Sequence, residues 1–107
     1  MIQPVHITVD PTSSLGYIEY RDEAEWVRTR RLLRAPDGSV AAHRFAERRS
    51  EPTGVHVELT GDDDVVALEI LSIDEPTFVA IARDYALQRG LSFPEDIRAD
   101  ATGSPAA

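Results

Sequence analysis

Hydrophobic and polar residues alternate along most of the first two-thirds of the chain, which is the period-two pattern of half-buried β-strands. Val5, Ile7 and Val9 alternate with polar residues, and residues 55–59 repeat the pattern. Residues 15–20 carry apolar side chains on both faces, which favours an interior strand. The alternation and the turn residues between these segments predict strands over residues 5–9, 15–20, 26–34, 40–48, 55–59 and 65–71.

The period changes after residue 72 to that of an amphipathic helix. Its apolar stripe consists of Phe78, Ile81, Ala82 and Tyr85. Asp74 is the predicted N-cap, and Gly90 is the predicted C-terminal stop. The sequence therefore predicts an α+β domain over residues 1–97, with one C-terminal helix on a meander-like antiparallel sheet of about five to six strands. Residues 98–107 are predicted to form a disordered tail.

Cysteine and lysine are both absent from the 107 residues. The absence of cysteine excludes disulfides, thiolate nucleophiles and cysteine-ligated metals, and the absence of lysine excludes Schiff-base catalysis. The formal net charge of −8 disfavours tight binding to duplex nucleic acid, whose phosphates need positive partners. The sequence shows neither the apolar length of a membrane span nor the pattern of a signal peptide. We therefore expect a cytoplasmic protein that needs no cofactor and does not contact a membrane.

The charge is unevenly distributed along the chain. Seven arginines and two acids lie within residues 28–49, so this block carries +5 and the rest of the chain −13. Alternation places Arg31 on one face of the predicted hairpin and most of the other basic side chains on the opposite face. The residues predicted to form a binding surface are Trp26, Arg28, Arg30, Arg34 and Arg44.

Such an arginine surface suits a second copy of the chain, an acidic partner protein or single-stranded nucleic acid. The −13 remainder repels phosphate at long range, so association with itself or with another protein is favoured over nucleic acid. The alternative is that acids elsewhere in the same chain neutralise the arginines.

A second group of candidates suits acid–base chemistry: Glu69, His56, Glu58 and Tyr17. Glu69 interrupts an apolar strand, and a buried carboxylate is rare unless it is paired. We expect that partner to be an arginine of the basic block, Tyr17 or Tyr20. His56 and Glu58 are two apart on one strand, so their side chains share a face.

A metal site is not predicted. His6 and His43 also lie on predicted strands, and a His/His/Glu site would form if the sheet placed one of them beside His56 and Glu58. No local metal motif supports such a site. The three consecutive aspartates at residues 62–64 lack the alternate spacing of a calcium loop, so we expect a solvated turn there.

Two pairs of segments carry a resemblance to a known family. The first pair reads ITVDP and LGYIEY (residues 7–11 and 15–20), and the second reads GVHVEL and VVALEIL (residues 54–59 and 65–71). Together they resemble the small prokaryotic family catalogued as domain of unknown function number 2283, whose members usually carry glycine where this chain has Ala67. The resemblance implies a small antiparallel sheet and an antitoxin-like role, because some relatives are encoded beside toxin-like proteins. It implies no catalytic residue.

The sequence as a whole favours a non-catalytic binding module that self-associates or binds a partner protein through its arginine-rich hairpin. The alternative is a small enzyme or ligand-binding protein with a pocket near Tyr17, Glu69 and the strand histidines. An enzyme is the less favoured of the two.

Overall fold

The fold is a single antiparallel sheet with its helices on one side. The computed structural model describes residues 1–21, 27–35, 38–41 and 51–101. The strands are β1 (His6–Val9), β2 (Gly16–Glu19), β3 (Arg28–Arg34), β4 (Val40–Ala41), β5 (Glu51–Leu59) and β6 (Val65–Ile70). The helices are α1 (Pro76–Gln88) and the single turn α2 (Ile97–Asp100). The predicted α+β class is confirmed. No helix in the described ranges is long and apolar enough to cross a membrane.

The strand order is β1-β2-β6-β5-β3-β4, with every neighbouring pair antiparallel. It departs from a meander at one point, because the β5–β6 hairpin inserts between β2 and β3. β2 lies between β1 and β6, so the interior strand predicted from its two apolar faces is confirmed. β5 begins at Glu51, four residues earlier than the predicted start at Val55. Most of the predicted strand over residues 40–48 lies outside the described residues.

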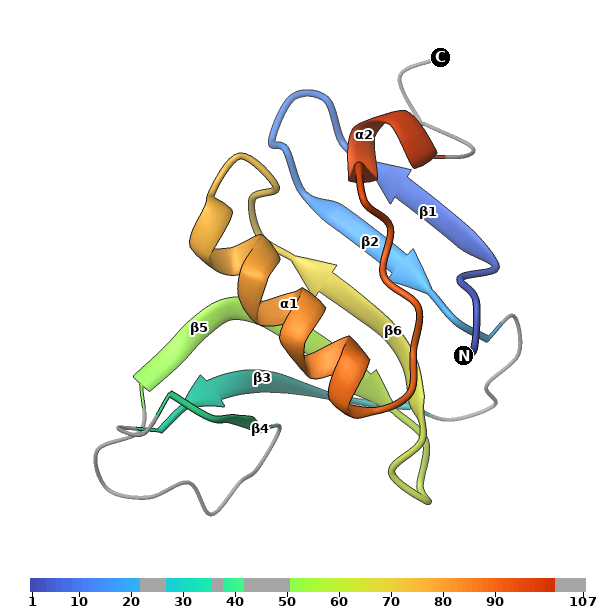
Figure 1. Ribbon diagram of the computed structural model, residues 1–107, viewed down its shortest axis with the longest axis vertical. Helices are drawn as coiled ribbons and strands as arrows, with labels where there is room; N and C mark the ends of the chain where they lie inside the picture. Colours follow the sequence, from blue (N-terminus) through green and yellow to red (C-terminus); the bar gives the residue numbers. More distant parts are fainter. Residues whose placement is uncertain (22–26, 36–37, 42–50, 102–107) are drawn as a thin grey trace.

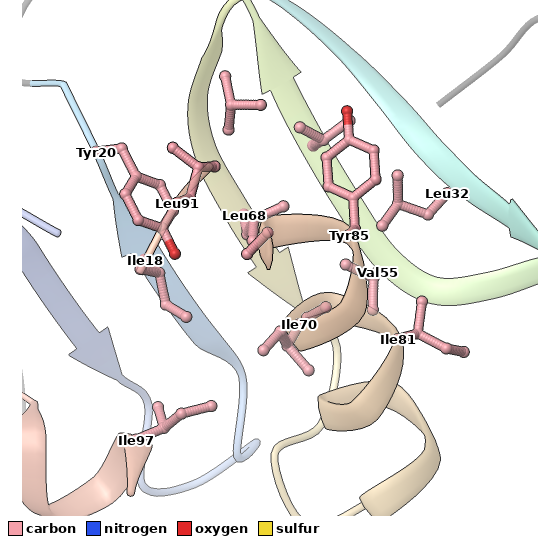
Figure 2. Packing of buried hydrophobic residues seen from close by; sticks show 14 of the residues in the cluster. Ile18, Tyr20, Leu32, Val55, Leu68, Ile70, Ile81, Tyr85, Leu91 and Ile97 are labelled. Carbon is pink, nitrogen blue, oxygen red and sulfur yellow. The ribbon is translucent and has the colours of Figure 1, made fainter. Parts of the chain in front are cut away.

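The helices and the chain between them pack on the same face of the sheet (Figure 1). Fully buried aliphatic side chains of the sheet meet α1 across this layer (Figure 2). The largest of them are Ile18, Leu32, Leu68, Ile70, Val55 and Val57. From the predicted helical stripe, Ile81, Ala82 and Tyr85 are buried, and Phe78 packs at the edge of the core. Burial of these side chains, at ~2 kcal/mol each, contributes to the driving force for the fold.

The start of α1 differs from the prediction. The N-cap is Glu75, whose side chain makes no capping hydrogen bond, and not Asp74. Asp74 instead accepts hydrogen bonds from Ser14 Oγ at 2.5 Å and from an Arg98 nitrogen at 2.7 Å. These two hydrogen bonds, Ser14 first, lower the pKa of the Asp74 carboxyl. The carboxylate thus joins the β1–β2 turn to α2, which is why it is unavailable as a cap.

The C-terminal boundary also differs from the prediction. Residues 98–100, predicted as tail, belong to α2, which Asp96 caps by accepting from the Ala99 amide at 3.2 Å. Ile97 is 6% exposed and belongs to the core cluster, so burial of its side chain holds this turn against β1. Residues 102–107 lie outside the described residues.

A glycine in β5 permits close contact with α1. The β3–β5 register shifts between Arg31 and Leu33, next to Gly54. A Cβ at Gly54 would lie 2.3 Å from the nearest carbon of the Phe78 ring. The Gly54 carbonyl also accepts from the Leu71 amide at 2.8 Å. The ring therefore packs directly on the backbone of β5.

Candidate functional site

The described helices leave the second face of the sheet uncovered, and we call this surface the open face. Strand register sets its side chains in two rows that run across the sheet. From β1 to β3, the first row is Thr8, Tyr17, Glu69, His56 and Arg31. The second row is His6, Glu19, Ala67, Glu58 and Thr29. All four candidate catalytic residues of the sequence analysis therefore lie together on the open face.

Alternation along each strand explains this placement. Val55, Val57 and Leu59 point into the core, so the intervening His56 and Glu58 must point to the other side. In β6, Leu68 and Ile70 are buried and Glu69 is half-buried. Glu69 therefore interrupts the apolar strand because its side chain points to the open face while its neighbours point into the core. Among the described residues, the core contains no buried charged side chain.

His56 is the centre of the first row. Arg31 Nε donates to His56 Nε2 at 3.3 Å, and His56 Nδ1 lies 3.4 Å from Glu69 Oε1. Because Nε2 accepts a hydrogen bond from arginine, the neutral ring carries its proton on Nδ1, which faces Glu69. The Nδ1–Glu69 contact has the distance of an ion pair but forms no hydrogen bond. The ring is thus held between a cation on β3 and a carboxylate on β6.

Tyr17 links the two rows. Its hydroxyl donates to Glu58 Oε2 at 2.6 Å. Tyr17 is opposite Glu69 and Glu58 is opposite Ala67, so the tyrosine side chain must cross β6 diagonally beside Ala67. This explains why Ala67 is 0% exposed although it lies on the open face. Burial, and secondly the hydrogen bond to Glu58, raise the pKa of the Tyr17 hydroxyl.

The pKa values of all three tyrosines are raised above the ordinary value in the folded protein. Burial raises the pKa of Tyr20 and Tyr85 as well as that of Tyr17. Because each folded-state pKa is raised, the associated stability is present below about pH 10 and is lost as the pH rises towards the folded-state values.

Phenolate absorbance followed during a pH titration checks this expectation, with circular dichroism recorded in parallel. While the fold is intact, absorbance should rise only at a pH above the ordinary tyrosine pKa of about 10. A tyrosine that titrates at its ordinary pKa in the folded protein contradicts the burial described above, and Tyr17→Phe then identifies whether Tyr17 is that residue.

The arginines of the basic block do not form one surface. Arg28 and Arg30 lie opposite Leu59 and Val57, on the helix-bearing face, and Arg31 lies on the open face. Arg30 donates to the carbonyl of Thr29 at 3.1 Å, and Arg34 is exposed beside Val40. Trp26, Arg44 and His43 lie outside the described residues. The predicted division of the block between two faces therefore agrees with the register.

The acidic turn between β5 and β6 binds arginines. Asp63 forms an ion pair with Arg28, and Asp64 forms one with Arg21 at 3.4 Å. Arg89, at the end of α1, donates to the Asp63 carbonyl at 2.5 Å. The predicted solvated turn is confirmed, because the side chains of Asp63 and Asp64 are 64% and 55% exposed even though both are paired with arginines. Because Arg28 is paired with an acid of its own chain, that part of the basic block is neutralised.

The partner of Glu69 differs from the one that was expected. Glu69 meets His56, where an arginine, Tyr17 or Tyr20 was expected. Tyr20 is on the core side and donates to the Ser92 carbonyl at 2.8 Å. His6 shares the second row with Glu58 but lies three strands away, about 14 Å, which is too far for joint metal ligation. The described residues contain no group of His, Asp and Glu suited to hold a metal.

Three hollows in the described surface are lined by other residues. One lies between α1, β4 and the β5–β6 turn and includes Val40, Leu59 and Tyr85. The second is lined mainly by Tyr20, Val65 and Leu91, and the third by residues near α2. None of the three is lined by Tyr17, Glu58, His56 or Glu69.

Comparisons with protein-family models, with curated proteins and with solved structures found no match to this chain. The resemblance to the family of unknown function therefore stays a prediction.

Proposed function

We propose that this protein is a non-catalytic binding module that contacts a partner protein through the open face of its sheet. The main support for this proposal is that the polar side chains on that face hold one another in place through hydrogen bonds and charge contacts. Tyr17 is bonded to Glu58, and His56 is held between Arg31 and Glu69. A surface whose side chains are already ordered loses less conformational entropy when a partner binds. Self-association and a different partner protein are both compatible with this surface.

The same contacts weigh against the alternative of a small enzyme. A histidine that acts as a general base needs a free ring nitrogen, but His56 Nε2 accepts from Arg31 and Nδ1 faces Glu69. The Tyr17 hydroxyl is held by Glu58, and its raised pKa keeps it protonated. Catalysis by these residues would require Arg31 to leave His56. A binding role requires no change in the contacts of His56 and Tyr17.

The open face replaces the arginine hairpin as the proposed contact surface. The hairpin divides its arginines between two faces, and Asp63 neutralises Arg28. The net charge of −8 continues to favour a protein partner over nucleic acid. A cytoplasmic location remains part of this proposal, on the sequence grounds given above.

Affinity capture with two charge-matched variants tests the proposal. Glu58→Gln with Glu69→Gln removes two charges from the open face while glutamine can still accept from Tyr17. Glu75→Gln with Glu95→Gln removes two charges from exposed residues outside the open face and is the control. Wild type and control should retain the same protein from an extract of the source cells, and the open-face variant should retain about tenfold less, as one lost charged contact would cause.

The captured protein is then purified and its Kd is measured for all three chains at two salt concentrations. Equal weakening of both variants would mean that only net charge matters, which contradicts the proposal. Retention of RNA or DNA in place of a protein, unaffected by the open-face variant, would contradict it as well.

A further inference from the structure

We propose that the open face docks a second copy of this chain, face to face, about a two-fold axis that runs parallel to the strands between β5 and β6. This inference rests on the proposed binding role of the open face and names its occupant. Sheets that pack in this way lie about 10 Å apart with their side chains in contact. The support comes from how the two rows of side chains complement themselves.

The first row is self-complementary under this rotation. The axis reverses the strand order, so β3 of one copy lies over β2 of the other and β5 lies over β6. Arg31 then faces Tyr17 of the second copy, and His56 faces Glu69 of the second copy. A guanidinium over an aromatic ring and an imidazole beside a carboxylate are both attractive pairs. Each pair occurs twice in the dimer because the interface is isologous.

The second row fits the same rotation. Glu19 faces Thr29 of the second copy, and Glu58 faces the Tyr17 ring that covers Ala67 of the second copy. Each carboxylate is therefore opposite an uncharged side chain. Moving the axis by half a strand spacing onto β6 would stack Glu69 on Glu69, and moving it onto β5 would stack Glu58 on Glu58. Repulsion between like charges therefore favours a two-fold axis that lies between β5 and β6.

Net charge determines how this dimer should respond to salt. Two copies of charge −8 repel each other at long range, and salt screens that repulsion over roughly 10 Å at 0.1 M. The close pairs on the face are partly removed from water, so salt screens them less. Dimerisation should therefore strengthen when salt is raised from low to physiological concentration. Binding of a basic protein or of nucleic acid should weaken over the same range.

Sedimentation equilibrium of the purified full chain, at low and physiological salt, tests the proposal. Arg31→Ser should weaken dimerisation about tenfold, because it removes both Arg31–Tyr17 contacts. Arg30→Ser is the matched control, since it is the neighbouring arginine of β3 but lies on the helix-bearing face opposite Val57. A chain that stays monomeric at all concentrations and salts, or equal weakening by the two variants, overturns the proposal.

Site-directed cross-linking checks the register independently of affinity, because the chain has no cysteine of its own. A mixture of the single variants Glu19→Cys and Thr29→Cys should cross-link with a short bis-maleimide, and each variant alone should not. Equal cross-linking in all three samples overturns the proposed axis. A monomeric chain whose open-face variant still loses a captured partner protein would contradict the self-docking alone and leave the proposed function intact.

Discussion

Gly54→Ala is expected to lower the free energy of unfolding by about 3 kcal/mol, the upper end of the cost of overpacking a core. The new methyl group would lie 2.3 Å from a Phe78 ring carbon, well inside van der Waals contact. The ring sits at the start of α1 and packs on the backbone of β5, so the helix or the strand must shift to admit the methyl group. Urea unfolding followed by circular dichroism measures the change.

A second background shows whether the contact with Phe78 is the cause. In the Phe78→Ala chain the ring is gone, so Gly54→Ala should be neutral or stabilising by about 0.5 kcal/mol, since alanine restricts the unfolded chain more than glycine does. The backbone of Gly54 has no positive φ that would penalise alanine. The same loss in both backgrounds would mean that the bulge of β5, and not the ring, requires glycine.

Ala67→Leu is expected to cost about 2 kcal/mol, from overpacking together with loss of a hydrogen bond to a charged group. Ala67 is 0% exposed on a face that the described helices leave uncovered. The Tyr17 side chain crosses β6 beside it to reach Glu58 at 2.6 Å. A leucine would occupy that path and force the tyrosine towards solvent. The pKa of Tyr17 should then fall towards its ordinary value, which phenolate absorbance detects.

Two further variants isolate the role of Tyr17 in this effect. Ala67→Ser adds one small atom and should change the free energy of unfolding by less than about 1 kcal/mol. In the Tyr17→Ala background, Ala67→Leu should cost little, because the space beside β6 is then empty. A leucine at position 67 that destabilises both backgrounds equally would show that Tyr17 does not pack there.

The candidate acid–base residues were predictable as a set, but their partners were not. Alternation alone assigns His56, Glu58 and Glu69 to the outer faces of their strands. The contact of Glu69 with His56 depends on the register of β5 against β6, which pairs these two residues. A shift of one residue would turn every side chain of one strand to the other face, and no local feature of either strand excludes it. Burial of the alternate side chains under α1 fixes the register.

The contact of Arg31 with His56 was not predictable from the sequence. It belongs to a dense arginine block, and only its position opposite the other members of that block hinted at a separate role. The structure pairs β3 with β5, although residues 35–50 separate these two strands in the chain. That long-range pairing brings Arg31 beside His56 and leaves Arg28 and Arg30 on the helix-bearing face. The distribution of the arginines therefore follows from tertiary pairing.

The amount of charge is set by the sequence, but the pairing of the charges is set by the fold. The counts of −8 overall and +5 within residues 28–49 follow directly from the residues. Where those charges meet depends on the fold, in which Asp63 and Asp64 bind arginines from three distant segments. The basic block is thereby partly neutralised, and the polar rows of the open face become the surface proposed for contact.

By itself, the sequence determined the α+β class, the alternation that builds the strands, the helical stripe and the exclusion of cysteine and lysine chemistry. These properties depend on residues that are near one another in the chain, or on composition alone. Strand order, register and the contacts between the rows depend on which distant segments pair. That choice is made by burying Ile18, Leu68, Val57 and their neighbours together in one core. Only the tertiary structure could therefore place Tyr17, Glu58, Glu69, His56 and Arg31 on one face.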